Sequence, residues 1–356
     1  MLSPSFCLEC RRVSAARMTK EKPGVAVRTL ADLARLAGVH AGTVSRALAG
    51  STVVNDETRL RIEALAAQHN FQPNQMARRL RTQRTGVIGI AVPLGHERRQ
   101  HVSDPFFLTL FGHLADALTE RGYDIMLSRI IPDTEDWLAR VVRSGMVDGV
   151  LLIGQSDQFD VIEAVAQDYQ PLVVWGSRVE GQHHCAIGVD NFNGGRLLGE
   201  HLITRGASRI AFMGEIRTLE ITERYRGLCA ATQAAGIARP IQLDTHMASD
   251  VMGEEIASNL DQVLGTIDAI ACASDVIARQ TIRTLTERGL SVPGDIKVTG
   301  FDDLPFTEQM IPSITTIRQD LAIGSKAMIN ALFARIRGEN TPSIEMTPRL
   351  MIRDSS

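Results

Sequence analysis

The stretch TLADLARLAGVHAGTVSRALAG, residues 29–50, decides how the first part of the chain folds. Thr29 followed three positions later by Asp32 resembles a capping box, the start of a helix. The apolar residues that follow recur at the spacing of one helical face, namely Leu30, Leu33, Ala34 and Ala37. Gly38 is suited to end this helix, because glycine readily adopts the left-handed conformation found just after helices. We therefore predict a helix from about Leu30 to Leu36.

A second helix is predicted at Ala41 to Ala49, ended by Gly50, and a third after Asn55, continuing to His69. Two short helices joined through a glycine match a helix-turn-helix, in which the second helix lies in the DNA major groove. As a bare pattern this is only moderately specific, because such pairs are common in ordinary helical cores. Residues 27–73 are predicted to form this module.

The charge of the chain is divided unevenly between its two parts. Residues 1–84 carry 14 Lys and Arg against 6 Asp and Glu, a balance of +8, whereas the remainder carries 24 against 35, a balance of −11. This asymmetry indicates a polyanionic partner for the first part only. A solvated basic surface explains the charge equally well on its own.

Two short segments flank this module, and a long segment follows from residue 85. Residues 1–26 show no periodicity, and we expect a disordered leader there. Residues 74–84 form a short, basic, helix-capable stretch that is marginal as an isolated helix, so it is a hinge candidate.

From residue 85 the pattern becomes alternating strands and helices, which is typical of a parallel α/β fold. The predicted strands are Val87–Pro93, Tyr123–Ser128, Val147–Gly154, Pro171–Gly176, Arg209–Gly214, Ala269–Ala273 and Ile296–Gly300. Helices are predicted at Phe107–Arg121, Asn193–Arg205, Thr222–Ala235 and Val276–Arg288. Two doubly wound lobes with a cleft between them fit this length, with ligands at the carboxyl ends of the strands. We expect one lobe from residues 85–187 with 315–342, and the other from 188–314 with 343–356.

Several classes of protein are disfavoured by the sequence. It has no apolar run long enough for a transmembrane span and no secretory signal at the N-terminus, so the cytoplasm is the expected compartment. It has no phosphate-binding loop with Lys-Ser/Thr and no nucleophile elbow, so an enzyme is not expected. Cys7-x-x-Cys10 and His183-His184-Cys185 each lack a second ligand pair at zinc spacing, so no metal site is expected.

Several motifs of the sequence resemble those of the lactose-repressor/galactose-repressor (LacI/GalR) family. Beyond residues 29–50, the resemblance includes Val54–Arg59 and Phe71–Asn74. It continues through Thr85–Ile90, Val189–Asn191 with Gly194–Gly195, Ser274–Asp275 and Gly300–Asp303, and so covers nearly everything after residue 26. The resemblance implies a helix-turn-helix headpiece, a hinge helix and a two-lobed α/β core like periplasmic sugar-binding proteins. It also implies a homodimeric repressor that binds palindromic operator DNA under the control of a small effector.

By this resemblance the base-contacting positions fall on Ala41 and Gly42, neither of which has a side chain able to hydrogen-bond a base. Arg46, one turn further on, is then the best remaining direct reader, because a guanidinium can bind guanine in a bidentate way. His40 stands where an N-cap serine is usual in the family. The other DNA-contacting residues of the headpiece, suited mainly to phosphate contacts or caps, are Thr29, Thr43, Ser45, Asn55 and Thr58.

The hinge stretch 74–81 also resembles that of the family, in which a leucine opens the central base step from the minor groove. That leucine is Leu80 here, and Arg78, together with the neighbouring Arg79 and Arg81, would neutralise phosphates. A leucine packed on the protein core is the alternative.

For the effector the resemblance implies a cleft formed by Asp104, Phe106, Arg224, Asp275 and Asp302. Trp175, at the end of a predicted strand, is added as an aromatic face for a sugar ring. Arg224, Asp275 and Asp302 would form a clamp for hydroxyl groups. For the aromatic residues the alternative is burial in the core, and for Phe107 burial is the preferred interpretation. For Asp190 and Asn191 the preferred interpretation is that they cap the following helix. Gly176 stands where some family members carry a sugar-contacting side chain, and would open space for a disaccharide or for a ring on Trp175.

The function predicted from sequence is a repressor of sugar-utilisation genes that a mono- or disaccharide inducer releases from DNA. No cofactor other than this effector, and no membrane partner, is expected. A corepressor-type regulator with a purine or phosphosugar effector, and a non-DNA-binding cytosolic sugar-binding protein, stay open as alternatives. So does a tetramer in place of the dimer.

Overall fold

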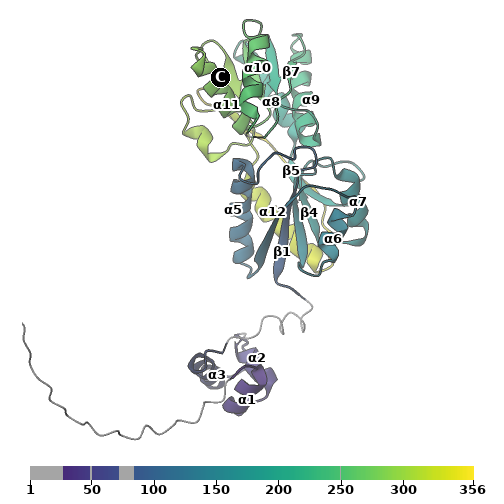
Figure 1. Cartoon of the computed structure of the whole chain (residues 1–356), viewed down its shortest axis with the longest axis vertical. Helices are drawn as coiled ribbons and strands as arrows, with labels where there is room; N and C mark the ends of the chain where they lie inside the picture. The colour runs from purple at the N-terminus through teal and green to yellow at the C-terminus, as the bar shows by residue number, and fades with distance from the viewer. Residues whose placement is uncertain (1–26, 49, 72–83, 249) are drawn as a thin grey trace, which may run out of the picture. The chain divides into compact units, whose positions relative to one another are not determined.

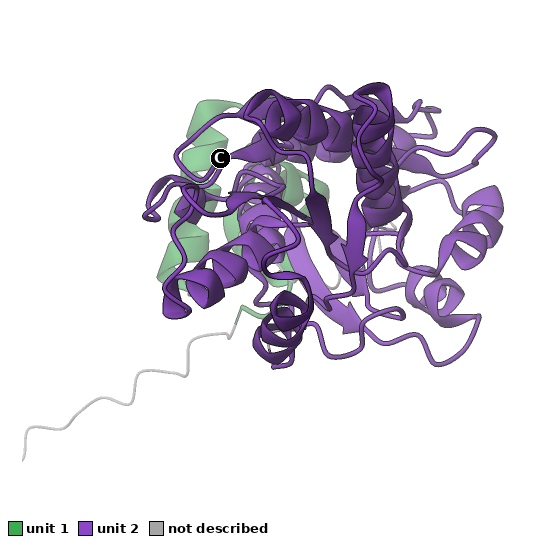
Figure 2. Cartoon of the chain, turned by 90° about the horizontal axis from the view of Figure 1, so that it is seen from above, with its two compact units in different colours: residues 1–83 green, residues 84–356 purple. Residues whose placement is uncertain are grey.

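The computed structural model describes residues 27–48, 50–71, 84–248 and 250–356. The chain divides into two compact units at residues 83 and 84, shown in different colours in Figure 2. Each unit is described by itself below. In the described part of the chain no helix is long and apolar enough to cross a bilayer.

The first unit contains the three helices expected from the pattern: α1 (Leu30–Ala37), α2 (Ala41–Leu48) and α3 (Asp56–Gln68). Their apolar faces meet in a small core centred on Leu33, Val44 and Ile62, whose side chains are fully buried. Gly38 has φ of 64°, the left-handed conformation that favours glycine, which explains why α1 ends there.

The second unit is built from two parallel sheets, each with helices packed against it (Figure 1). The first sheet has the order β11-β5-β4-β3-β1-β2. Its strands are β1 (Val87–Pro93), β2 (Asp124–Ile130), β3 (Gly149–Ile153), β4 (Leu172–Trp175), β5 (Cys185–Val189) and β11 (Ile344–Met346). The helices of this lobe are α5 (Pro105–Thr119), α6 (Trp137–Arg143), α7 (Phe159–Asp168) and α12 (Leu321–Ile336).

Successive residues of the central strands face opposite layers of this lobe. Leu151 and Ile153 belong to the core that includes residues of α5 and α12, whereas Val150 and Leu152 belong to the core that includes residues of α6 and α7. Both faces of the sheet are therefore covered, which explains why the strands appear in the sequence as continuous apolar runs.

The second sheet has the order β7-β6-β8-β9. Its strands are β6 (Ile210–Met213), β7 (Ile241–Leu243), β8 (Ala269–Cys272) and β9 (Lys297–Thr299). Its helices are α8 (Asn191–Thr204), α9 (Leu219–Ala234), α10 (Met252–Val263) and α11 (Asp275–Glu287), followed by the short 3₁₀ helix η1 (Pro305–Glu308). In both sheets the first strand lies between the second and the third, so each sheet has a topological switch point at that strand.

The boundaries expected for the two lobes are wrong in two short segments. Residues 315–342 were assigned to the first lobe, but β10 (Thr316–Arg318) pairs with β12 (Arg349–Met351), and Thr315 and Arg318 form bridges to Thr299 and Asp302 of the second lobe. Residues 343–356 were assigned to the second lobe, but β11 pairs with β5 in the first sheet. Strands of three residues are too short to carry a recognisable period, so the sequence offered no signal for these crossings.

Candidate functional sites

The first candidate site is the surface of α2 in the headpiece, which local interactions position. The Thr29 side chain accepts a hydrogen bond from the main-chain N–H of Asp32 while the Asp32 carboxylate accepts from that of Thr29, so both halves of the predicted capping box are present. Asn55 caps α3 by accepting from the N–H of Thr58 at 2.8 Å. These contacts fix the helix starts on either side of α2. They also occupy the hydroxyl of Thr29 and the amide oxygen of Asn55.

The first turn of α2 is capped by a histidine. The Nδ1 atom of His40 accepts a hydrogen bond from the N–H of Gly42 at 3.2 Å, the contact that a serine or aspartate oxygen makes at many helix starts. A side chain at position 42 would approach His40 and Arg46 to 3.3 and 3.4 Å, so glycine suits this capped turn.

Arg46 is the exposed cation of α2, and its Nε atom donates to the carbonyl of Gly42 at 3.1 Å. The ion pairs of the described headpiece residues involve Arg35 and Arg59, not Arg46. The Arg46 guanidinium is thus available for an anion or a base edge. Ala41, Thr43 and Ser45 are half-buried, and the hinge candidates Arg78 and Leu80 lie outside the described residues.

The second candidate site is a cleft of about 1000 Å³, mouth included, in the two-lobed unit. Its walls come from both lobes. They are formed by residues at or after the carboxyl ends of strands β1, β3, β4, β6, β7, β8 and β9. This is where ligands bind in open α/β sheets. Five of the six residues predicted for the effector line it, namely Asp104, Phe106, Trp175, Arg224 and Asp302.

Arg224, on α9, is held rigidly in the floor of the cleft. Its Nε donates to Asn191 at 2.8 Å, its Nη1 donates to the carbonyl of Ala273 at 2.6 Å, and the guanidinium lies 3.7 Å from the centre of the Phe301 ring. Nη1 is also 3.8 Å from the carboxylate of Asp302. Burial lowers the pKa of Arg224, while the carboxylates around it, Asp302 above all, oppose this effect.

Close packing of α8 on α9 places this arginine. A Cβ atom at Gly195 would lie 1.9 Å from the carbonyl oxygen of Arg224, so only glycine allows the two helices to approach this closely. Asn191 orients the Arg224 side chain, whereas Asp190 caps α8 by accepting from the N–H of Asn193, the role preferred for it from sequence.

Asp275 does not line the cleft, so its predicted part in a hydroxyl clamp is wrong. Its side chain is fully buried and accepts hydrogen bonds from the hydroxyl of Thr316 at 2.6 Å and from the N–H of Leu304 at 2.8 Å. It stabilises the loop that carries Asp302 instead. Burial raises the pKa of Asp275 well above its usual range.

The two cleft aspartates are both held in place and poorly hydrated. Asp104 caps α5 by accepting from the N–H of Phe106, and Asp302 accepts from the side-chain amide of Gln319 at 2.6 Å. Burial raises the pKa of Asp104, and burial raises that of Asp302 to about 7 although Arg224 acts in the opposite direction. Both carboxyl groups keep acceptor positions suited to hydroxyl hydrogens.

The aromatic wall of the cleft differs from the expected one. Trp175 is only 5% exposed and packs edge-on against Phe106, so the half-buried Phe106 presents more of its ring to the cleft. Gly176 does not open space for a sugar, because a Cβ there would lie 2.8 Å from the side chain of Gln155. The interpretation of Gly176 is therefore wrong: the space next to it is filled by Gln155, two residues after the end of β3.

Other lining residues were not singled out from sequence. The polar ones among them include Glu97, Gln100, Ser156, Glu215 and Glu220. Glu215 lies two residues after the end of β6, so the rule that ligands meet the carboxyl ends of strands would have found it. Glu97 and Gln100 belong to a long loop whose path no local pattern reveals.

His183 and His184 belong to a carboxylate cluster rather than to the metal-like pattern with Cys185. Their Nδ1 atoms contact the two oxygens of Glu163, which also accepts from both main-chain N–H groups. Burial raises the pKa of Glu163, but these hydrogen bonds outweigh it and lower the pKa to about 2. Cys7 and Cys10 lie outside the described residues.

Two family models match the chain. That of the bacterial regulatory proteins, lacI family, matches residues 29–74, and that of the periplasmic binding protein-like domain matches residues 200–356. These matches cover the headpiece and much of the second part of the core.

Individual relatives match nearly the whole chain. The HTH-type transcriptional repressor PurR of Actinobacillus pleuropneumoniae serotype 3 is 30% identical over 341 residues, or 92% of this chain and 98% of that protein. The HTH-type transcriptional regulator CelR of Thermobifida fusca is 29% identical over 337 residues, with the same coverage.

Solved structures give the same result. A transcriptional regulator CelR–cellobiose complex is similar with a TM-score of 0.63 at 28% identity, over 92% of this chain and 99% of that one. The lac repressor dimer bound to operator and the anti-inducer ONPF has a TM-score of 0.78 at 24% identity, over 92% and 98%, and so shares the fold. From the two-part architecture and the identity to PurR over nearly its whole length, the chain belongs to the lacI family of bacterial regulatory proteins.

Proposed function

We propose that this protein is a transcriptional repressor that binds palindromic operator DNA as a homodimer and is released by a neutral mono- or disaccharide. In this role it acts by binding in the cytoplasm and not as an enzyme. The DNA part is supported by the helix-turn-helix with both flanking helices capped and with the Arg46 guanidinium exposed on α2.

The residues that line the cleft favour a neutral sugar as the effector. Its described lining residues include five carboxyl groups, on Glu97, Asp104, Glu215, Glu220 and Asp302, against the single guanidinium of Arg224. A phosphosugar would be repelled by this excess of acidic groups, whereas sugar hydroxyls can donate to carboxylates and accept from Arg224. Phe106 adds an apolar face for the C–H surface of a ring. The CelR complex with cellobiose supports the same class of ligand.

The site residues divide between the two functions as follows. For DNA we propose Arg46 as the direct reader, Thr43, Ser45 and Thr58 as phosphate contacts, and Ala41 as an apolar contact. The parts proposed for Arg78 and Leu80 rest on the family resemblance alone. For the effector we propose Arg224, Asp104 and Asp302 as hydroxyl partners, with Phe106 and the edge of Trp175 as the apolar wall.

Fluorescence anisotropy of a labelled duplex tests this proposal. A palindromic duplex with a central CG step, backed by a pool of random duplexes, is titrated across salt concentrations with and without mono- and disaccharides, phosphosugars and purine bases. We expect tight binding that weakens steeply with salt and that one neutral sugar abolishes. Binding released or strengthened only by a phosphosugar or purine would contradict the effector proposal, and no binding to any duplex would contradict the DNA proposal.

The variant Arg46→Ala sharpens the same experiment. Loss of a bidentate base contact is expected to cost roughly 1–3 kcal/mol on the specific site and little on random duplexes. Arg35→Ala, which removes an exposed arginine of α1 paired with Asp32, serves as the matched control. Equal weakening on specific and random duplexes would show that Arg46 contacts phosphate only.

A further inference from the structure

Glu97 is a buried carboxylate with an unpaired oxygen. It lies in the loop after β1, in the first lobe, and is 6% exposed. One oxygen accepts from the N–H of Arg99 at 3.2 Å, but Oε2 has no hydrogen-bond partner among the described residues. A buried carboxyl oxygen without a partner is costly and rare, so it points to a positively charged or hydrogen-donating ligand.

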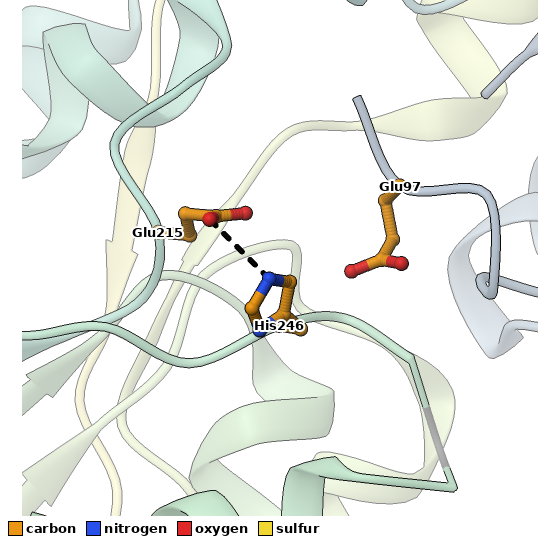
Figure 3. A group of neighbouring side chains, drawn as sticks. All are labelled: Glu97, Glu215 and His246. Carbon is orange, nitrogen blue, oxygen red and sulfur yellow. Dashed lines mark ion pairs between the residues drawn. The ribbon is translucent and has the colours of Figure 1, made fainter. Parts of the chain in front are cut away.

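The second lobe brings two further ligand groups to the same place. Glu215 follows β6 and His246 follows β7, and one ligand atom from each of Glu97, Glu215 and His246 lies within 4.8 Å of the others. Figure 3 shows the Glu97 carboxylate directed toward the imidazole from the opposite side to Glu215. The three residues thus converge from two lobes on one point at the cleft.

The imidazole of His246 is oriented for a ligand on its Nε2 atom. Its Nδ1 lies 2.8 Å from Oε1 of Glu255, and its main-chain N–H donates to Oε2 of the same carboxylate at 2.8 Å. When Nδ1 donates the proton to Glu255, Nε2 presents a lone pair toward Glu215, 3.3 Å away. A histidine held by a carboxylate on one nitrogen commonly binds a metal ion through the other.

We propose that Glu97, Glu215 and His246 form a site for one divalent cation of the zinc class, which joins the two lobes at the effector cleft. One imidazole nitrogen with two carboxylate oxygens is a donor set that zinc accepts, and it leaves a coordination position open. Glu97 and Glu215 also line the cleft, so that position is next to the effector.

One neighbouring cation has to move for this site to fill. The Nε atom of Arg217 lies 2.7 Å from Oε1 of Glu215, the oxygen that His246 also approaches. The Arg217 side chain is 63% exposed, so it can turn into solvent when a metal ion takes its place. The competing explanation is a doubly protonated His246 that bridges the two glutamates without any metal.

Zinc titration of the full chain against a chromophoric chelator tests the proposal. Every sample carries Cys7→Ser and Cys10→Ser and has no purification tag, so that these thiols and a tag do not bind zinc. We expect one zinc ion per chain, bound more tightly than magnesium. Glu97→Gln and His246→Gln should each weaken this binding at least tenfold, and Glu255→Gln should weaken it by roughly 10- to 100-fold.

The matched control is His183→Gln, which removes an exposed histidine that also contacts a glutamate. It should leave the zinc affinity unchanged. Glu97→Gln should melt, without metal, at or above the temperature of the parent protein, because it replaces a buried, incompletely paired carboxyl group with a neutral amide. No saturable zinc binding, a preference for magnesium, or equal affinity in the parent, Glu97→Gln and His246→Gln would overturn the proposal in favour of the protonated histidine.

Discussion

The headpiece and the effector cleft carry their functional residues in opposite ways. In the headpiece, Thr29, His40 and Asn55 act on residues two or three positions away, and the exposed Arg46 lies between His40 and Asn55. In the cleft, Arg224 is held by Asn191, Ala273 and Asp302, which are 33, 49 and 78 positions away along the chain. A small local unit thus presents a surface, while a large non-local unit encloses a ligand.

This difference decides how each region responds to substitution. A residue of the cleft network is tied to several segments, so its loss should change both stability and effector binding. A residue of the headpiece should change operator binding and leave the cleft intact. The experiments below give results that would either contradict this separation or define it more closely.

The largest effect is expected for Arg224→Ala. It leaves the Asn191 amide oxygen without its donor and the buried Asp302 without its cation, with Gln319 still bound to that carboxyl group, so the free energy of unfolding of the core should fall by roughly 3–5 kcal/mol. Urea denaturation followed by circular dichroism measures this loss. Arg226→Ala, on the same helix but with an ion pair to the surface residue Glu223 as its one such pair among the described residues, should cost less than about 0.5 kcal/mol. Similar losses for both variants would contradict the network.

The next effect is expected for Leu33→Ala in the headpiece. Leu33 is fully buried, and its truncation should cost about 3 kcal/mol, a large share of the stability of so small a unit. Operator affinity should fall more than tenfold while the effector affinity, measured by titration calorimetry, stays unchanged. The control is Leu36→Ala on the same helix, where the side chain is 45% exposed. It should leave both affinities close to wild type. A weakened effector affinity in Leu33→Ala would contradict independent units.

A pH effect is expected from Asp302 in the cleft. Its pKa is raised to about 7 by burial, above the usual 3.8, so the folded state binds a proton more tightly than the unfolded state. Stability from this group is therefore complete below about pH 4 and is lost as the pH rises through about 7, by about 4 kcal/mol in total. Asp302→Asn should remove this contribution. Unfolding curves at pH 5, 6, 7 and 8 that remain parallel for the two proteins would show that Asp302 is ionised throughout.

The smallest effect is expected for Thr29→Ala. It removes the side-chain half of the capping box at the start of α1 and should lower the free energy of unfolding of the headpiece by about 1 kcal/mol. Hydrogen exchange of the α1 amide protons, measured in the whole protein, reports this local opening. Thr29→Ser, which keeps the hydroxyl, is the control. Equal protection of α1 in the two variants would show that the cap does not stabilise the helix.

The same contrast explains what the sequence could reveal. The caps of α1 and α3 and the end of α1 at Gly38 depend on neighbouring residues, so their roles were predictable from spacing. The family resemblance implied that Asp275 is a cleft residue, yet a contact from Thr316, 41 positions away, holds its carboxylate in the core. Gln155 fills the space beside Gly176 in the same way. No pattern within one segment carries this information.

The strands absent from the prediction include several of the shortest ones, as well as β5 and β7. β10, β11 and β12 have three residues each, and they carry the chain back and forth between the lobes. Glu97 was missed for a similar reason, because only its approach to Glu215 and His246 on the other lobe gives it significance. Long-range contacts thus decided both the lobe boundaries and the polar lining of the cleft.

The central claim is that the cleft and the headpiece of this chain are coupled through one effector. Titration calorimetry of the sugar found in the anisotropy screen, with and without a saturating amount of operator duplex, tests it most directly. Because coupling is reciprocal, the operator should weaken sugar binding by the same factor by which the sugar weakens operator binding, roughly 5- to 150-fold. An unchanged sugar affinity in the presence of bound operator would contradict the claim.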